Sequence, residues 1–90
     1  MIVYLVWNGM NKDRADISRF FSSFIEAEKQ CMLMAAEHQV SWVARIGLPV
    51  LTKDVLCDLL NGRMQMQSWD DIYVAKLKEG KVVGQRIPLQ

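Results

Sequence analysis

The pattern of apolar positions predicts a buried β-strand near the start of the chain. Ile2 to Trp7 is a continuous apolar run, rich in β-branched and aromatic residues, and Asn8-Gly9 ends it. A short run without polar alternation is typical of a strand that is covered on both faces. The polar residues 11–16 that follow predict a loop.

Residues 17–23 fit either a second strand or the start of a long helix. As a strand, this stretch stops at Ser22-Ser23; as a helix, its apolar residues continue a stripe at helical spacing into the next segment. Ser23 followed by Glu26 matches a capping box, and a serine pair is unfavourable inside a helix. We therefore favour a strand followed by a helix over residues 24–38. The residues of this helix expected to face the core are Phe24, Ala27, Cys31, Met34 and Ala35.

The middle of the chain predicts a half-buried strand and then a short helix. Val40 to Ile46 alternates between two sets of side chains, which is the period of a strand with two different faces. Thr52 is a suitable N-cap, and Asn61-Gly62 a suitable stop, for a helix from Lys53 to Leu60. We expect this helix to pack through Val55, Leu56, Leu59 and Leu60.

The last third of the chain predicts a β-hairpin. Ile72 to Leu77 and Val82 to Ile87 are strand-like and are joined by a turn that contains a glycine. Residues 63–71 allow an extended segment before them. A helix from Ser68 to Glu79 is the alternative interpretation, and the cluster Ile72-Tyr73-Val74 disfavours it because β-branched and aromatic residues prefer strands.

These elements together predict an α+β fold. We expect a mostly antiparallel sheet of about four to five strands, with one long and one short helix packed on one face. Ninety residues suffice for one hydrophobic core, so we expect a single domain over residues 1–90. With 51% apolar and 23% charged residues, the chain falls among ordinary globular proteins and not among disordered ones.

The charge distribution gives weak support to a nucleic-acid partner. The net charge is only +1, whereas non-specific binding to nucleic acid depends on a clear basic excess that displaces counterions from phosphates. The basic residues of the C-terminal part, with one tyrosine as a stacking platform, form the candidate set Tyr73, Lys76, Lys78, Lys81 and Arg86. The plainer interpretation is a solvated edge strand that its charges protect from unwanted pairing.

The cysteines and the N-terminal residues indicate a cytoplasmic protein. Cys31 and Cys57 each fall on the apolar stripe of a predicted helix, so each is expected to be a small core residue, although a bridge between them stays open. The first residues lack the pattern of a signal peptide, and no apolar run is long enough to span a bilayer. We therefore expect reduced thiols and no membrane partner.

The residues that could carry chemistry lie apart from one another. His38, the only histidine, falls at the end of the long predicted helix, where it interacts with the helix dipole. Cys31 precedes it by seven residues, about 10 Å by helix rise, which is too far for a nucleophile and base pair. Asp70-Asp71 is the only adjacent carboxylate pair, and no zinc-type spacing or glycine-rich loop occurs. We expect no catalytic, cofactor or metal site, and we expect that the protein is not an enzyme.

The segment from Arg63 to Asp71 is the strongest candidate for recognition. Tryptophan, arginine and methionine are enriched at protein interfaces, and three tryptophans are many for this length. We expect Trp7 and Trp42 to be core residues, while Trp69 either plugs the sheet edge with Met66 or belongs to a partner-binding segment. The partner-binding candidates are Arg63, Met64, Met66, Trp69, Asp70 and Asp71.

The first 38 residues resemble small accessory proteins of phages and mobile elements. The residues that carry the resemblance are Ile2 to Trp7, Phe21-Ser22-Ser23 and Glu26-Ala27-Glu28, in which an apolar strand precedes a polar loop and a second strand runs directly into a helix. The chain departs from this pattern at Phe24 and Ile25, where such proteins usually carry polar residues. The resemblance implies a stand-alone protein-binding protein, in some cases an inhibitor of host machinery, as anti-CRISPR proteins are.

Three hypotheses follow. The leading one is a non-enzymatic protein-binding module, with a host enzyme or defence complex as its partner. The second is a nucleic-acid-associated module that uses the basic hairpin. The third is a homo-oligomeric structural subunit that pairs through an exposed strand edge, a homodimer being the simplest case.

Overall fold

The computed structural model describes residues 1–9, 16–63 and 66–88. It contains one antiparallel sheet of five strands and two helices, which confirms the predicted α+β class. In chain order the elements are β1 (Ile2–Asn8), β2 (Asp16–Phe21), α1 (Phe24–His38), β3 (Val40–Gly47), α2 (Lys53–Leu60), β4 (Ser68–Lys78) and β5 (Lys81–Arg86).

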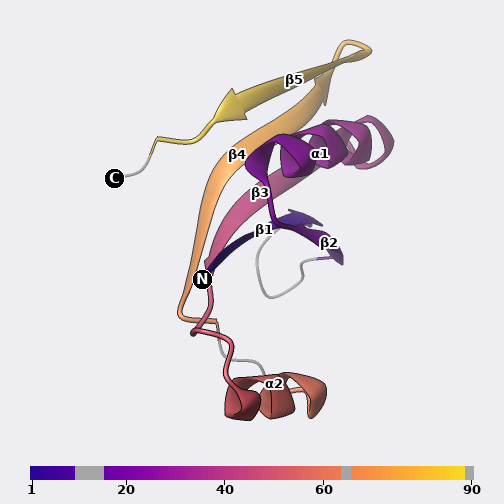
Figure 1. The fold of residues 1–90 in the computed structure, drawn as a ribbon. Helices are drawn as coiled ribbons and strands as arrows, with labels where there is room; N and C mark the ends of the chain where they lie inside the picture. Colours follow the sequence, from indigo (N-terminus) through magenta and orange to yellow (C-terminus); the bar gives the residue numbers. More distant parts are fainter. Residues whose placement is uncertain (10–15, 64–65, 89–90) are drawn as a thin grey trace.

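The strands follow the order β2-β1-β3-β4-β5 across the sheet, and every neighbouring pair is antiparallel (Figure 1). The continuous apolar run of β1 therefore lies inside the sheet, with β3 on one side and β2 on the other. The two edge strands are β2 and β5. The basic C-terminal strand is thus an edge strand, as its charges suggested.

Helix α1 covers one face of the sheet and begins where the capping box predicts. The Ser23 hydroxyl oxygen accepts a hydrogen bond from the Glu26 backbone N–H at 3.3 Å, and β2 ends two residues earlier, at Phe21. The prediction of a strand followed by a helix is therefore confirmed. The buried residues of this α1 face are Val6, Ala27, Cys31, Ala35, Val43, Tyr73 and Ala75.

Phe24 fixes the start of α1 against the sheet. Its ring makes edge contacts with Tyr4 of β1 and Tyr73 of β4, with ring centroids 5.9 and 5.8 Å apart. The Arg86 guanidinium of β5 lies 4.8 Å from the centre of the same ring. An aromatic residue at this position thus joins the helix to three strands.

The β4–β5 hairpin has the predicted position and a tight turn. Glu79 and Gly80 both have positive φ, of 50° and 80°, as a two-residue type I′ turn requires. Strand β4 starts at Ser68, earlier than expected, so the alternative of a helix from Ser68 to Glu79 is wrong. Residues 68–71 pair with the end of β3, and this pairing outweighs their weak strand propensity.

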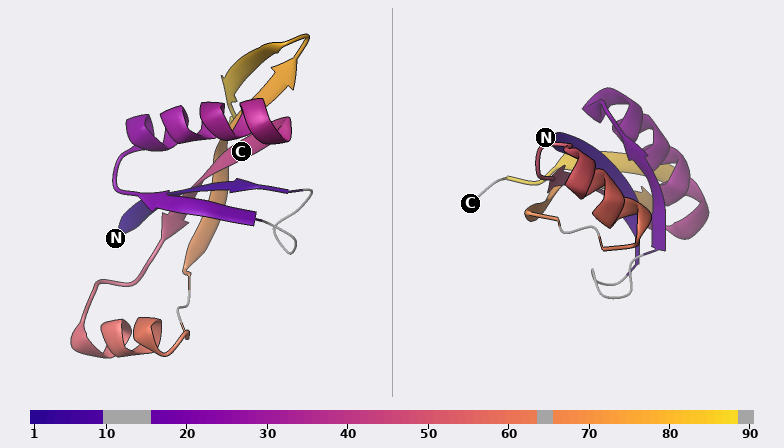
Figure 2. Two further views of the ribbon diagram at one scale, coloured as in Figure 1. Left: turned by 90° about the vertical axis from the view of Figure 1, so that its right-hand side faces the viewer. Right: turned by 60° about the horizontal axis from the view of Figure 1, so that its bottom comes forward.

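Helix α2 does not pack as predicted. Thr52 caps it, accepting a hydrogen bond from the Val55 N–H at 3.2 Å, but none of its residues is buried. No Cα atom of α2 comes within 8 Å of another helix or strand of the described chain, and Figures 1 and 2 show α2 beyond one end of the sheet. The prediction that α2 packs on the sheet through Val55, Leu56, Leu59 and Leu60 is therefore wrong for a single copy of the chain. Neither helix is long and apolar enough to span a membrane.

The close contact between β5 and Tyr73 predicts a strict requirement for glycine at position 84. A Cβ at Gly84 would overlap the Tyr73 ring and hydroxyl and would lie 3.1 Å from the Met32 sulfur. We expect Gly84→Ala to lower the free energy of unfolding in urea by about 1–3 kcal/mol. Adding Tyr73→Phe, which removes the nearest atom, should recover part of this loss, whereas purely additive effects would contradict the clash.

Candidate protein-binding surface

A β-bulge brings Asp71 to the face of the sheet that α1 leaves uncovered. Val43 pairs with Tyr73, but the next residue, Ala44, pairs with Asp71, so Ile72 is an extra residue in β4. Without it, side chains would alternate and Asp71 would share the face of Tyr73. With it, Asp71 lies on the opposite face, among the tryptophans.

All three tryptophans meet on this opposite face. The ring of Trp7 stacks on Trp42, with centroids 5.6 Å apart and 15° between planes, and meets Trp69 edge-on at 5.8 Å. One carboxylate oxygen of Asp71 accepts hydrogen bonds from the indole N–H of Trp7 at 2.8 Å and of Trp69 at 3.1 Å. The Trp42 indole N–H is buried and has no acceptor among the described residues. We call these four residues the tryptophan cluster.

The tryptophan cluster belongs to a second hydrophobic core. Its buried residues are Leu5, Trp7, Ala44 and Ile46, and the half-buried ones packed on them are Val3, Trp42, Leu48, Met66 and Trp69. The prediction of a core residue is therefore confirmed for Trp7, while Trp42 is half-buried and packs on this core together with Trp69 and Met66. No helix of the described chain lies over this core, so its own bulky side chains cover it.

The predicted partner-binding segment is thus divided by the structure. Met66, Trp69 and Asp71 pack in or beside the tryptophan cluster, whereas Arg63 and Asp70 are exposed. Met64 lies outside the described residues. Arg63, three residues after the end of α2, is the member of this segment that is exposed beside apolar residues of the α2 region.

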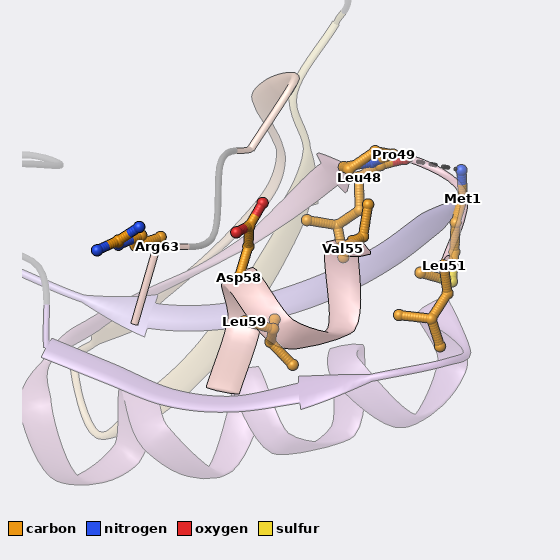
Figure 3. A pocket seen from close by; sticks show the side chains of 8 residues that line it. All are labelled: Met1, Leu48, Pro49, Leu51, Val55, Asp58, Leu59 and Arg63. Carbon is orange, nitrogen blue, oxygen red and sulfur yellow. Dashed lines mark hydrogen bonds between the residues drawn. The ribbon is translucent and has the colours of Figure 1, made fainter. Parts of the chain in front are cut away.

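The main exposed apolar surface lies on α2 and the segment before it. Leu60 is 77% exposed, Val50 74% and Leu56 41%. Leu56 and Leu60 are four residues apart on the helix, so they form one ridge. Val55 and Leu59 face back toward the sheet, as Figure 3 shows. The helix therefore has a broad apolar arc of which no residue is buried.

A hollow separates α2 from the end of the sheet. It has a volume of about 420 Å³ and is lined by Met1, Leu48, Pro49, Leu51, Val55, Asp58, Leu59 and Arg63 (Figure 3). A second volume of about 340 Å³ lies between Val3, Phe20, Leu48 and Leu59, and shares two residues with the first. We call this hollow, the Leu56–Leu60 ridge and the exposed residues Val50 and Leu51 the α2 surface.

The residues of the nucleic-acid hypothesis do not form one surface. In the register of the hairpin, Lys76, Lys78 and Lys81 point away from α1. Tyr73 lies on the α1 face, where it is only 7% exposed, so its ring cannot act as a stacking platform. Arg86 pairs with Tyr73 and lies over the Phe24 ring. Strand alternation in the sequence already places Tyr73 and Lys76 on opposite faces, but it does not show which of these faces α1 covers.

The candidate chemical residues stay apart in space. Cys31 is buried, and this burial raises the pKa of its thiol from 9.0 to about 11. Cys57 is exposed on α2, which corrects the expectation of a core residue, and both thiols are free. His38 is exposed, 3.8 Å from the Glu37 carboxylate. No group of three or more metal-ligating side chains occurs in the described part of the chain.

Comparison of this chain with protein-family models, with curated proteins and with solved structures gives no match. The functional argument below therefore depends on the geometry of the chain itself.

Asp71 provides a test of the tryptophan cluster. We expect Asp71→Ala to lower the free energy of unfolding by about 1–3 kcal/mol, because the part-buried Trp7 N–H loses its acceptor. Asp71→Asn removes the same charge but keeps an acceptor oxygen, so it should recover much of the loss. The exposed neighbour is the control: Asp70→Ala should change stability by less than about 0.5 kcal/mol. Equal losses for Ala and Asn at position 71 would contradict the hydrogen-bonding role.

Cys31 predicts a loss of stability at alkaline pH. Its thiol stays protonated in the fold up to about pH 11, whereas the unfolded chain releases this proton near pH 9.0. The unfolded state is therefore favoured increasingly across that interval, and the raised pKa of Tyr73, caused mainly by desolvation, acts in the same direction. Urea unfolding at several pH values should show a shallower decline for Cys31→Ala. A Cys57→Ala control should keep the wild-type slope, and identical slopes in all three proteins would contradict the assignment.

Proposed function

We propose that this chain is a non-enzymatic module that acts by binding another protein chain through its α2 surface. The observation that carries the proposal is that no residue of the apolar arc of α2 is buried: Leu56, Leu59 and Leu60 are exposed and Val55 is half-buried. The capped ends and amphipathic pattern of this helix are typical of a helix that packs against another surface. Exposed apolar patches next to polar residues mark interaction sites.

The shape and charge of the α2 surface favour a protein as the ligand. A small molecule of suitable size could fill the hollow, but it would leave the Leu56–Leu60 ridge and Val50 in water. The polar side of α2 carries Lys53, Asp54 and Asp58, a net charge of −1. Helices that lie on membranes instead have Lys and Arg on their polar side, so a lipid surface suits α2 poorly.

The resemblance of the first 38 residues supports a class of partner. Small accessory proteins of phages and mobile elements bind and in some cases inhibit host enzymes or defence complexes. A host protein of this kind is the partner that we propose for the α2 surface.

Affinity capture with matched variants tests this proposal. The tagged chain is used as bait for host proteins, and the proteins retained by the wild type are compared with those retained by Leu60→Glu. The control is Leu33→Glu, the same substitution at a leucine of α1 that is 65% exposed. We expect a specific host protein to be retained by the wild type and the control, and to be reduced at least tenfold with Leu60→Glu, because a buried glutamate is costly.

The same comparison shows when the proposal fails. If every protein retained by the wild type is retained equally by Leu60→Glu, the α2 surface is not the binding site. If Leu60→Glu and Leu33→Glu both reduce retention, the effect does not belong to α2.

A further inference from the structure

The chain exposes more surface than a compact monomer of its size. Its accessible surface is 6514 Å², whereas a folded monomer of 10.4 kDa exposes about 5,400 Å². The Cα radius of gyration is 13.9 Å, compared with about 12 Å for a compact chain of this length. The molecule is elongated, 48 by 23 by 22 Å, with α2 at one end and the turn of the β4–β5 hairpin at the other (Figure 2).

The surplus surface matches the area that one partner contributes to a stable interface. The difference between observed and expected surface is about 1,100 Å², and each side of a standard protein interface buries about 800 Å². Of the twelve large apolar side chains that are exposed in the described residues, five lie between residues 50 and 60 and belong to the α2 surface: Val50, Leu51, Leu56, Leu59 and Leu60. The α2 surface therefore contributes part of this surplus.

The α2 surface has two parts of opposite shape. One part is a ridge, formed by Leu56 and Leu60, and the other is the apolar hollow beside it, bounded by Leu48 and Leu59. A ridge of one copy fills the hollow of another, and a two-fold axis repeats the same contact in the reverse direction. Two copies thus cover both parts without any other protein, and two-fold pairing is the commonest symmetry of protein oligomers.

The charges at the rim of the hollow suit this arrangement. Asp58 and Arg63 have opposite charges, both line the hollow, and no ion pair joins their side chains in the described structure (Figure 3). Opposite charges on one rim allow a two-fold pair in which Asp58 of each copy lies opposite Arg63 of the other. The net charge of +1 gives little long-range repulsion between copies.

We propose that the chain forms a two-fold homodimer in which α2 of each copy packs its Leu56–Leu60 ridge into the hollow of the other. This inference rests on the proposed function, because it takes the α2 surface to be a protein-binding surface, and it names a second copy as the occupant in the purified protein. A host protein then binds by displacing that copy. This dimer differs from one that pairs through the edge strands β2 or β5, because strand-edge pairing would leave α2 exposed.

Sedimentation equilibrium of the purified full chain tests the dimer. We expect the wild type to be dimeric at about 10 µM and to dissociate on dilution. Leu60→Glu should raise the dissociation constant about a hundredfold, since a symmetric dimer contains each substitution twice. Leu33→Glu, on α1, should leave the dissociation constant unchanged. Circular dichroism and urea unfolding of the diluted monomers should show the same fold in all three proteins.

Each outcome decides between named alternatives. A wild type that is monomeric up to millimolar concentration overturns the dimer, while a host protein whose capture depends on Leu60 still supports the proposed function. A dimer that Leu60→Glu leaves intact overturns the α2 interface and indicates strand-edge pairing. A dimer that depends on Leu60, with no Leu60-dependent host protein, supports the second copy as the occupant and removes the host partner.

Discussion

A five-stranded sheet has two faces, and this chain has one helix that lies on the sheet. Helix α1 is 15 residues long and covers one face, reaching all five strands. The other face must be shielded from water by the side chains of the strands themselves. Much of the architecture follows from this constraint: the bulky residues on the open face, their mutual packing, and an apolar α2 that lies at the end of the sheet instead of across it.

The tryptophan cluster shields the centre of the sheet face that α1 leaves uncovered from water. Large flat rings shield Leu5 and Ile46 completely, although no helix of the described chain lies above them. Stacking orders the rings, and Asp71 accepts hydrogen bonds from two of the indole N–H groups. This part of the face is therefore a structural core. The surface that we propose as the binding site lies beyond the cluster, around α2, where apolar side chains are exposed.

The elements with a local signal could be predicted from the sequence. Alternation in β3, the capping box before α1, the Thr52 cap of α2 and the glycine-containing hairpin turn each depend on residues close together in the chain, and the structure has all of them. What could not be predicted depends on partners far apart. The extra residue Ile72 reverses the side of Asp71, and period-two patterns do not contain that information. Likewise, the apolar arc of α2 indicates that another surface packs against this helix, but the sequence does not identify that surface.

The two ends of the segment that carries α2 are hydrogen-bonded to each other. Where the chain leaves β3 and returns to β4, the Gln67 N–H donates to the Gly47 carbonyl oxygen at 2.8 Å, so residues 48–66 form an excursion whose two ends are hydrogen-bonded neighbours. Leu48 and Met66 at its two ends pack on the second hydrophobic core, but mutation between them alters the sheet little, because the pairing of β3 with β4 is complete without that stretch. If the α2 surface binds a partner as we propose, the chain divides its two tasks between different stretches of sequence: the strands and α1 maintain the fold, and the α2 segment is free to diverge as the partner changes.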